Sequence, residues 1–132
     1  WFVAAAQPPH LKAIIPWEGL SDVYRDCAHH GGIPETGFPA YYVYTLFRVR
    51  NRAYGMARNF FALATSDALM DDFWAERVAA LEDIEVPALV CASWSDQGLH
   101  TRGAFEAFER MASREKFLFA HGRKKWETFY SP

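Results

Sequence analysis

Two apolar runs in the second half of the chain each end close to a residue with catalytic potential. The run from Val86 to Ala92 is followed by Asp96. The run from Phe117 to Ala120 is followed directly by His121. In an open parallel sheet, ligands and catalytic groups gather outside the carboxyl ends of the strands. A carboxylate at one strand end and an imidazole at the next can orient a general base toward a nucleophile. The spacing therefore predicts that Asp96 orients His121.

The nucleophile that such a pair would serve is not visible. Three serines lie near the expected site, namely Ser93, Ser95 and Ser131. None of them occupies a G-x-S-x-G turn, the strained geometry that exposes a nucleophilic hydroxyl to its base. Ser95 fits better as a structural hydroxyl at a strand end. We therefore expect the nucleophile to come from outside this sequence.

Both residues of the pair have an alternative interpretation. Asp is favoured at turns that precede a helix, so Asp96 can be a capping residue. His121 can be an ordinary loop residue, and His100 is a rival base. Because His100 lies only four residues after Asp96, we expect a local contact between these two and favour His121 as the base. In the non-catalytic alternative, the chain is an interaction module in which Asp96 and His121 are structural.

A second group of polar residues, Asp26, Cys27, His29 and His30, has side chains of types that bind metals. Adjacent histidines point in different directions, and the group does not complete a four-ligand set with a recognised spacing. Packing and hydrogen bonding explain it better. We predict no metal site, and nothing in the sequence implies an organic cofactor.

Composition narrows the class of protein. The 132 residues are 51% hydrophobic, 17% aromatic and 23% charged, which favours a folded domain over a disordered chain. A formal net charge of −2 argues against a nucleic-acid or anionic membrane partner. The apolar runs are far shorter than the roughly 20 residues that span a bilayer. Cys27 and Cys91 lack metal-type spacing, and Cys91 falls in a predicted buried strand, so we expect reduced thiols and a cytoplasmic setting.

The spacing of apolar residues and the positions of glycine and proline predict the elements that position Asp96 and His121. The strand–helix–strand order is that of a crossover in a parallel sheet, so the predicted fold class is α/β. The insertion over 19–85 is too long for a simple crossover and is expected to form a helical cap over the carboxyl edge of the sheet. The predicted elements are a helix end at Trp1–Gln7, a strand at Leu11–Pro16, a loop with a short turn at Gly19–Phe38, one or two helices over Pro39–Thr65, a helix at Met70–Leu81, strands at Val86–Ser93 and Lys116–Ala120 with a helix at Thr101–Ala112 between them, and a helix beginning at Trp126.

The insertion is rich in aromatic residues, and most of them must form its own core. Trp17 and Tyr24 follow the strand at Leu11–Pro16 closely, so these two are the candidates for lining a substrate pocket. The other aromatic residues in question are Phe38, Tyr41, Tyr42, Phe73 and Trp74.

Several segments together resemble the X-Pro dipeptidyl-peptidase-like branch of the α/β-hydrolases, which includes cocaine-esterase-like and acylase-like enzymes. The segments that carry the resemblance are WFVA at 1–4, PPHLKAIIP at 8–16, DVYRD at 22–26, HGG at 30–32, DFW at 72–74, VPAL at 86–89 and WSD at 94–96. In one respect the chain departs from the pattern. Many relatives place the base after a Gly-Pro-Trp turn, whereas Gly122–Trp126 contains no His here.

The resemblance implies a partial α/β-hydrolase fold in a serine hydrolase that acts on a small-molecule ester, amide or peptide. It implies that the nucleophile elbow lies just before Trp1 and that a β-sandwich follows Pro132, so we interpret residues 1–132 as an internal piece of one hydrolase domain. Such a piece should lack hydrolytic activity. It should also expose apolar surface, and we expect self-association or a complementary part of the parent chain to cover that surface.

Overall fold

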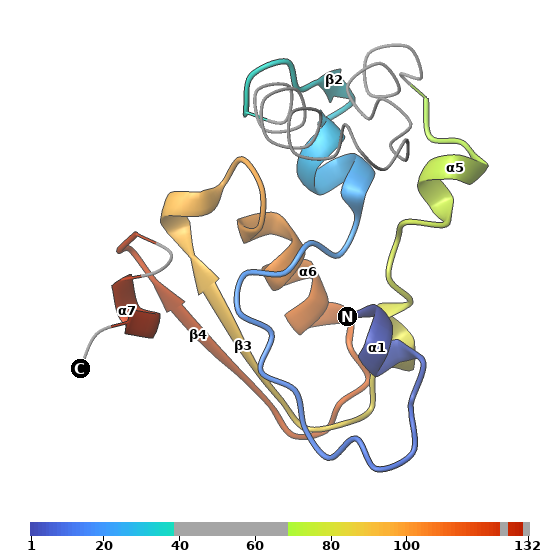
Figure 1. Ribbon diagram of the computed structural model, residues 1–132, viewed down its shortest axis with the longest axis vertical. Helices are drawn as coiled ribbons and strands as arrows, with labels where there is room; N and C mark the ends of the chain where they lie inside the picture. Colours follow the sequence, from blue (N-terminus) through green and yellow to red (C-terminus); the bar gives the residue numbers. More distant parts are fainter. Residues whose placement is uncertain (39–68, 125–126, 131–132) are drawn as a thin grey trace, which may run out of the picture.

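Figure 1 shows the computed structural model, which describes residues 1–38, 69–124 and 127–130. The helices expected over Pro39–Thr65, together with Tyr41, Tyr42 and Ser131, lie outside the described residues. In chain order the described elements are α1 (Phe2–Ala5), the π-helical turn η1 (Tyr24–Ala28), β1 (His29–His30), β2 (Ile33–Pro34), α5 (Asp72–Ala75), the 3₁₀ turn η3 (Leu81–Asp83), β3 (Ala88–Ser93), the 3₁₀ turn η4 (Trp94–Asp96), α6 (Thr101–Arg110), β4 (Lys116–His121) and α7 (Glu127–Tyr130). Within these ranges, none of the helices has the length and apolar character needed to cross a membrane.

The central sheet is parallel, as predicted for an α/β fold. β3 pairs with β4 in a register that runs from Ala88 opposite Lys116 to Ser93 opposite His121. On the other edge of β3, the segment 14–17 pairs in parallel through bridges at Ile14 and Trp17. The sheet therefore places β3 between two parallel neighbours.

The strand expected at Leu11–Pro16 is present as an extended segment and not as a continuous ladder. Ile14 donates its N–H to the Pro87 carbonyl at 2.9 Å, and the Pro16 carbonyl accepts from the Cys91 N–H at 3.0 Å. Proline has no N–H, so Pro16 cannot donate the bond that would fall between these two. Pairing resumes at Glu18, which donates to the Cys91 carbonyl at 3.0 Å.

Helix α6 covers one face of the sheet and forms the core with it. Ala104 and Ala107 of α6 are fully buried, and these small side chains let the helix approach β3 closely. Val90 and Ala92 of β3 belong to the same buried cluster. The strand–helix–strand crossover predicted from the sequence is present, and α6 ends at Arg110, two residues before the predicted end at Ala112.

The opposite face of the sheet is more open. Side chains alternate along a strand, so Leu89, Cys91 and Ser93 point away from α6. Their register partners in β4 share this face and are Phe117, Phe119 and His121. Phe117 is 66% exposed and Phe119 41% exposed.

The described parts of the insertion are less helical than predicted. The helix expected at Met70–Leu81 is only the single turn α5, capped by the Asp71 side chain, which accepts from the Trp74 N–H at 3.1 Å. The backbone then turns to pair with the start of the insertion, where Val78 bridges Asp22 and the Ala79 N–H donates to the Ser21 carbonyl at 2.8 Å. This long-range pairing competes with helix continuation and ends it.

The first part of the insertion contains the short turn expected around Asp22–Cys27, which is η1. The hairpin β1–β2 follows η1, and Gly31 and Gly32 connect its strands with φ of +62° and +85°. Only glycine adopts these angles without strain. In Figure 1, η1 and the hairpin lie at the end of the molecule toward which β3 and β4 run.

Candidate functional site

The two expected catalytic residues leave the sheet at the same edge. Ser93, the last residue of β3, lies opposite His121, the last residue of β4. Asp96 closes η4, the turn that directly follows β3. The parallel register thus brings the two strand ends side by side, as the sequence predicts.

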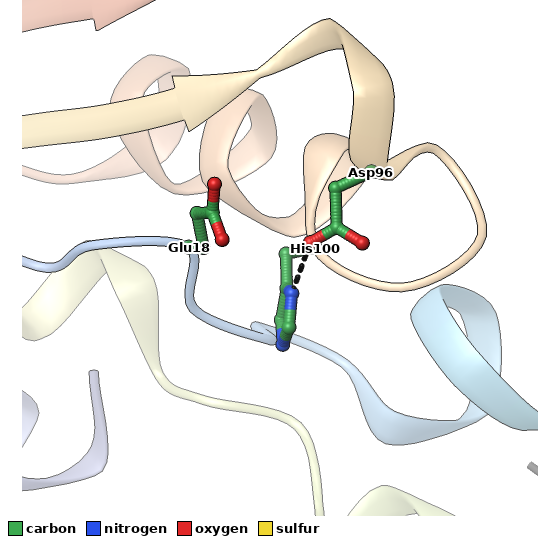
Figure 2. A group of neighbouring side chains, drawn as sticks. All are labelled: Glu18, Asp96 and His100. Carbon is green, nitrogen blue, oxygen red and sulfur yellow. Dashed lines mark hydrogen bonds and ion pairs between the residues drawn. The ribbon is translucent and has the colours of Figure 1, made fainter. Parts of the chain in front are cut away.

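Asp96 makes its short side-chain contact within its own loop. Its Oδ2 atom is hydrogen-bonded to Nδ1 of His100 (Figure 2). Both side chains are largely buried. The Asp96 carbonyl also accepts from the N–H groups of Leu99 and His100, both at 3.1 Å, which folds this loop into a tight turn. A contact across so few residues costs little chain entropy. The local contact expected between His100 and Asp96 is therefore present.

His121 is not hydrogen-bonded to Asp96. Both of its ring nitrogens are buried, and within the part of the chain that the structure describes they have no hydrogen-bond partner. The ring packs instead beside Phe119, with centroids 5.6 Å apart. Asp96 is paired with His100 because that partner lies in the same turn, and the His121 imidazole has no carboxylate partner among residues 1–38, 69–124 and 127–130.

Glu18 is a third acidic group at this edge, and sequence reasoning missed it. A carboxylate oxygen of Glu18, a carboxylate oxygen of Asp96 and a ring nitrogen of His100 all lie within 4.8 Å of one another. Figure 2 shows the three side chains. Glu18 is only 6% exposed, and its φ of +59° is unusual for a residue other than glycine. Such backbone strain is concentrated at functional sites. Glu18 directly follows segment 14–17, which pairs in parallel with β3. The expectation that functional groups follow the ends of parallel strands could therefore have identified it from the sequence.

The two aromatic candidates for substrate binding lie apart. Trp17 packs on the open face of the sheet, 6.4 Å from the Phe119 ring and 5.2 Å from the Phe129 ring of α7. Tyr24 belongs to η1, where its ring stacks on His29 at 4.4 Å. The structure therefore does not bring Trp17 and Tyr24 together.

Tyr24 does line a cavity of about 350 Å³ next to the loop that carries Asp96. Its walls come from η1, from the β1–β2 hairpin and from the region around the start of α6. The lining residues are Tyr24, Arg25, Asp26, His30, Gly31, Gly32, Gln97 and Arg102.

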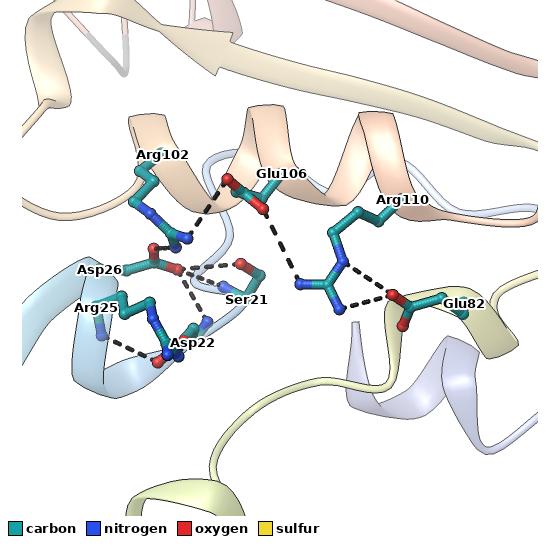
Figure 3. A network of polar contacts seen from close by, with 8 residues as sticks. All are labelled: Ser21, Asp22, Arg25, Asp26, Glu82, Arg102, Glu106 and Arg110. Atoms are coloured by element: carbon teal, nitrogen blue, oxygen red, sulfur yellow. Dashed lines mark hydrogen bonds and ion pairs between the residues drawn. The ribbon is translucent and has the colours of Figure 1, made fainter. Parts of the chain in front are cut away.

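The group Asp26, Cys27, His29 and His30 is held by packing and hydrogen bonds. Asp26 is buried, and its carboxylate accepts from the backbone N–H groups of Ser21 at 2.8 Å and of Asp22 at 2.9 Å. Its other oxygen accepts from Arg102 of α6 at 2.7 Å. Figure 3 shows how this contact continues along α6 through Glu106 and Arg110 to Glu82. The network fastens the start of the insertion to the helix that follows Asp96.

Burial also shapes the chemistry of Cys27. Desolvation, with smaller contributions from Asp26 and Glu35, raises the pKa of its thiol to about 11. The thiolate is the nucleophilic form of cysteine. Cys27 is therefore a packing residue and a poor nucleophile at neutral pH.

Comparison with solved structures identifies close relatives of the whole chain. Two structures of a CocE/NonD family hydrolase from Staphylococcus aureus match it, one at 49% sequence identity with a TM-score of 0.91 and the other at 50% with a TM-score of 0.93. Each match covers 99% of this chain and 23% or 24% of the relative, so the chain spans about a quarter of that hydrolase. No protein-family model and no curated protein matches the chain. The resemblance predicted from the sequence is confirmed.

Proposed function

The chain belongs with the CocE/NonD family hydrolases, and on this premise we propose that it supplies the acid and the base of a serine hydrolase. The parent enzyme would cleave ester or amide bonds by acyl transfer, as acyl esterases and X-Pro dipeptidyl-peptidases do. A serine from outside the chain attacks the carbonyl carbon. His121 takes the serine proton and returns it to the leaving group, while Asp96 fixes the imidazole tautomer and stabilises the imidazolium.

The observation that carries this proposal is the burial of both His121 ring nitrogens at the edge of the sheet where β3 and β4 end. Leaving a buried polar group without a hydrogen bond costs about 1–3 kcal/mol, and such groups in native proteins call for an explanation. Within the described ranges, both ring nitrogens of His121 are buried and without a hydrogen bond. A triad base needs a carboxylate at Nδ1 and a hydroxyl at Nε2, so partners of this kind would satisfy both.

The contact between Asp96 and His100 makes His100 the rival base, and the two histidines can be separated experimentally. In a full-length CocE/NonD hydrolase containing this segment, we expect His121→Gln to lower kcat by at least about 10³-fold, as loss of a triad base does. His100→Gln should keep kcat within about tenfold, because it removes only a local partner of Asp96. The reverse pattern would assign the base to His100, and two fully active variants would support the non-catalytic alternative.

The isolated 132-residue chain provides a second test. Without its nucleophile it should neither turn over p-nitrophenyl acetate by acyl transfer nor react with a fluorophosphonate probe. The full-length hydrolase is the matched control and should be labelled at one serine. Stoichiometric labelling of a serine within the 132 residues would show that the nucleophile lies inside the chain and would refute this part of the proposal.

A further inference from the structure

Two serine hydroxyls hold the segment of chain that follows His121. Ser93 Oγ lies 2.7 Å from the carbonyl oxygen of Arg123, and Ser95 Oγ lies 2.8 Å from the same oxygen. The two hydroxyl oxygens are 2.8 Å apart. Each hydroxyl has a single proton to donate, so two of these three contacts are hydrogen bonds at any moment. Each of the three possible distributions leaves the Arg123 carbonyl bound to β3, to the turn after it, or to both.

The residues that make this contact are sequence or register neighbours of Asp96 and His121. Ser93 lies opposite His121 in the parallel register, and Ser95 directly precedes Asp96. Arg123 comes two residues after His121. The contact therefore joins the turn that carries Asp96 to the turn that leaves His121.

Little else in the described structure holds this second turn. Gly122, Arg123 and Lys124 are exposed, and a Cβ added at Gly122 would meet open space. Among the described residues, the Arg123 side chain makes an exposed ion pair with Glu127 at 3.6 Å, and the Lys124 carbonyl accepts from the Glu127 N–H at 3.0 Å. Exposed pairs of this kind contribute little. Ser93, in contrast, is 1% exposed and also accepts the N–H of Ser95 at 3.2 Å, so its hydroxyl is fixed in place.

We propose that Ser93 and Ser95 are positioning residues that fix the location of His121 relative to Asp96. This inference rests on the proposed function, since it concerns the same acid and base. Neither serine touches the reacting atoms in this account. They act through the Arg123 carbonyl, which sets the path of the backbone that leaves His121. A misplacement of about 1 Å in a catalytic group can cost on the order of 10²-fold in rate.

The test uses the full-length hydrolase with Ser95→Ala, Ser93→Ala and the double substitution. We expect the double variant to lower kcat by about 10²-fold with KM changed less than about threefold, because substrate binding does not involve these hydroxyls. Ser95→Thr keeps the hydroxyl at an exposed position and should restore most of kcat. Should Ser93→Ala fail to fold, the exposed Ser95→Ala and Ser95→Thr pair still decides the question.

Ser113→Ala is the matched control. Ser113 is also buried and also bonds backbone carbonyls, donating to Ile84 at 3.0 Å or Val86 at 2.6 Å, but it lies just before β4, at the opposite end of the strand from His121. It should lower Tm without lowering kcat. If the double serine variant behaves like Ser113→Ala, losing Tm and keeping kcat, the positioning role is refuted.

His121→Gln and Asp96→Asn separate this result from a failure of the proposed function. If both abolish turnover while the double serine variant retains kcat, only the positioning role is wrong. If neither affects turnover, the proposed function itself is wrong, and the positioning role falls with it.

Discussion

Asp96 and His121 differ, residue by residue, in their hydrogen bonding. Asp96 already has a partner in His100, whereas the ring nitrogens of His121 are buried without one among the described residues. Asp96 and His100 lie in the loop that follows β3, whereas His121 ends the neighbouring strand β4. We propose that His100 is a local partner, which Asp96 leaves for His121 when the complete site is assembled.

The role of Asp96 can be tested by removing its charge and keeping its shape. In the full-length hydrolase, Asp96→Asn should lower kcat by about 10⁴-fold, because the amide holds the imidazole of the base in the wrong tautomer. KM should change little. Glu18→Gln is the comparison variant, since Glu18 lies in the same cluster and has no role in the proposed proton transfer. Equal losses in the two variants would show that the cluster acts as a unit and that Asp96 has no distinct role.

A second residue-level prediction concerns Cys27. The folded thiol has a pKa of about 11 against an ordinary value of 9.0, so at pH 8 very little of it is thiolate. The neutral thiol is favoured by folding, and the stability linked to this group is present below pH 9 and is lost as pH rises toward 11. We expect iodoacetamide at pH 8 to modify Cys27 far more slowly in the native protein than in urea. Peptide mapping by mass spectrometry measures this, and equal rates would contradict the buried placement.

At the scale of elements, the approach of α6 to the start of the insertion depends on Gly103. A Cβ at this position would lie 2.5 Å from Oδ2 of Asp26, 2.8 Å from the Ser21 nitrogen and 2.9 Å from the Gly19 carbonyl oxygen. Two of these three atoms belong to the backbone and cannot move aside easily. The network in Figure 3 therefore requires a glycine here, at the point where the insertion is fastened to α6.

Gly103→Ala should consequently destabilise the protein although alanine is the better helix former. Helix propensity favours alanine by about 1 kcal/mol, while overpacking costs about 1–3 kcal/mol and the displaced Asp26 adds to that cost. Gly98→Ala is the control, because a Cβ there meets open space. Thermal unfolding should show a lower Tm for Gly103→Ala and an unchanged Tm for Gly98→Ala. A higher Tm for Gly103→Ala would contradict the close approach.

The sequence predicts some of these elements well because their signals are local. The crossover is visible in the sequence because β3 and β4 are apolar runs and α6 has apolar residues at helical spacing. The residues at which the two strands end can then be read from the ends of those runs. The helix predicted at Met70–Leu81 is wrong because residues 77–79 pair with residues 21–23, a contact that no local pattern encodes. The strain at Glu18 is likewise a tertiary property. The contact between Asp96 and His100 follows from their spacing of four residues, whereas the burial of the His121 ring nitrogens depends on tertiary packing.

Across the molecule, the open face of the sheet carries several exposed hydrophobic side chains. Four exposed hydrophobic residues lie on the segment 14–17 and on β3 and β4, namely Ile15, Leu89, Phe117 and Phe119. Contiguous apolar patches on soluble proteins mark surfaces that another part covers. The chain spans about a quarter of the hydrolase that it matches, and we propose that the remainder of such a protein covers this face.

The 132-residue chain should therefore self-associate when it is produced alone. Light scattering after size-exclusion chromatography should give a mass that rises with concentration. Phe117→Lys combined with Phe119→Lys should reduce this association, because lysine on a sheet disfavours edge and face contacts. Lys12→Glu changes charge away from the face and serves as control. A monomer at every concentration would contradict the proposed exposure.

A crystal structure of the full-length hydrolase after reaction with a fluorophosphonate would show directly whether His121 and Asp96 serve the nucleophilic serine. We predict a modified serine outside residues 1–132, with Nε2 of His121 within about 3 Å of its oxygen and Nδ1 facing Asp96. A modified serine whose nearest imidazole is that of His100, or that has neither histidine within reach, would contradict this prediction.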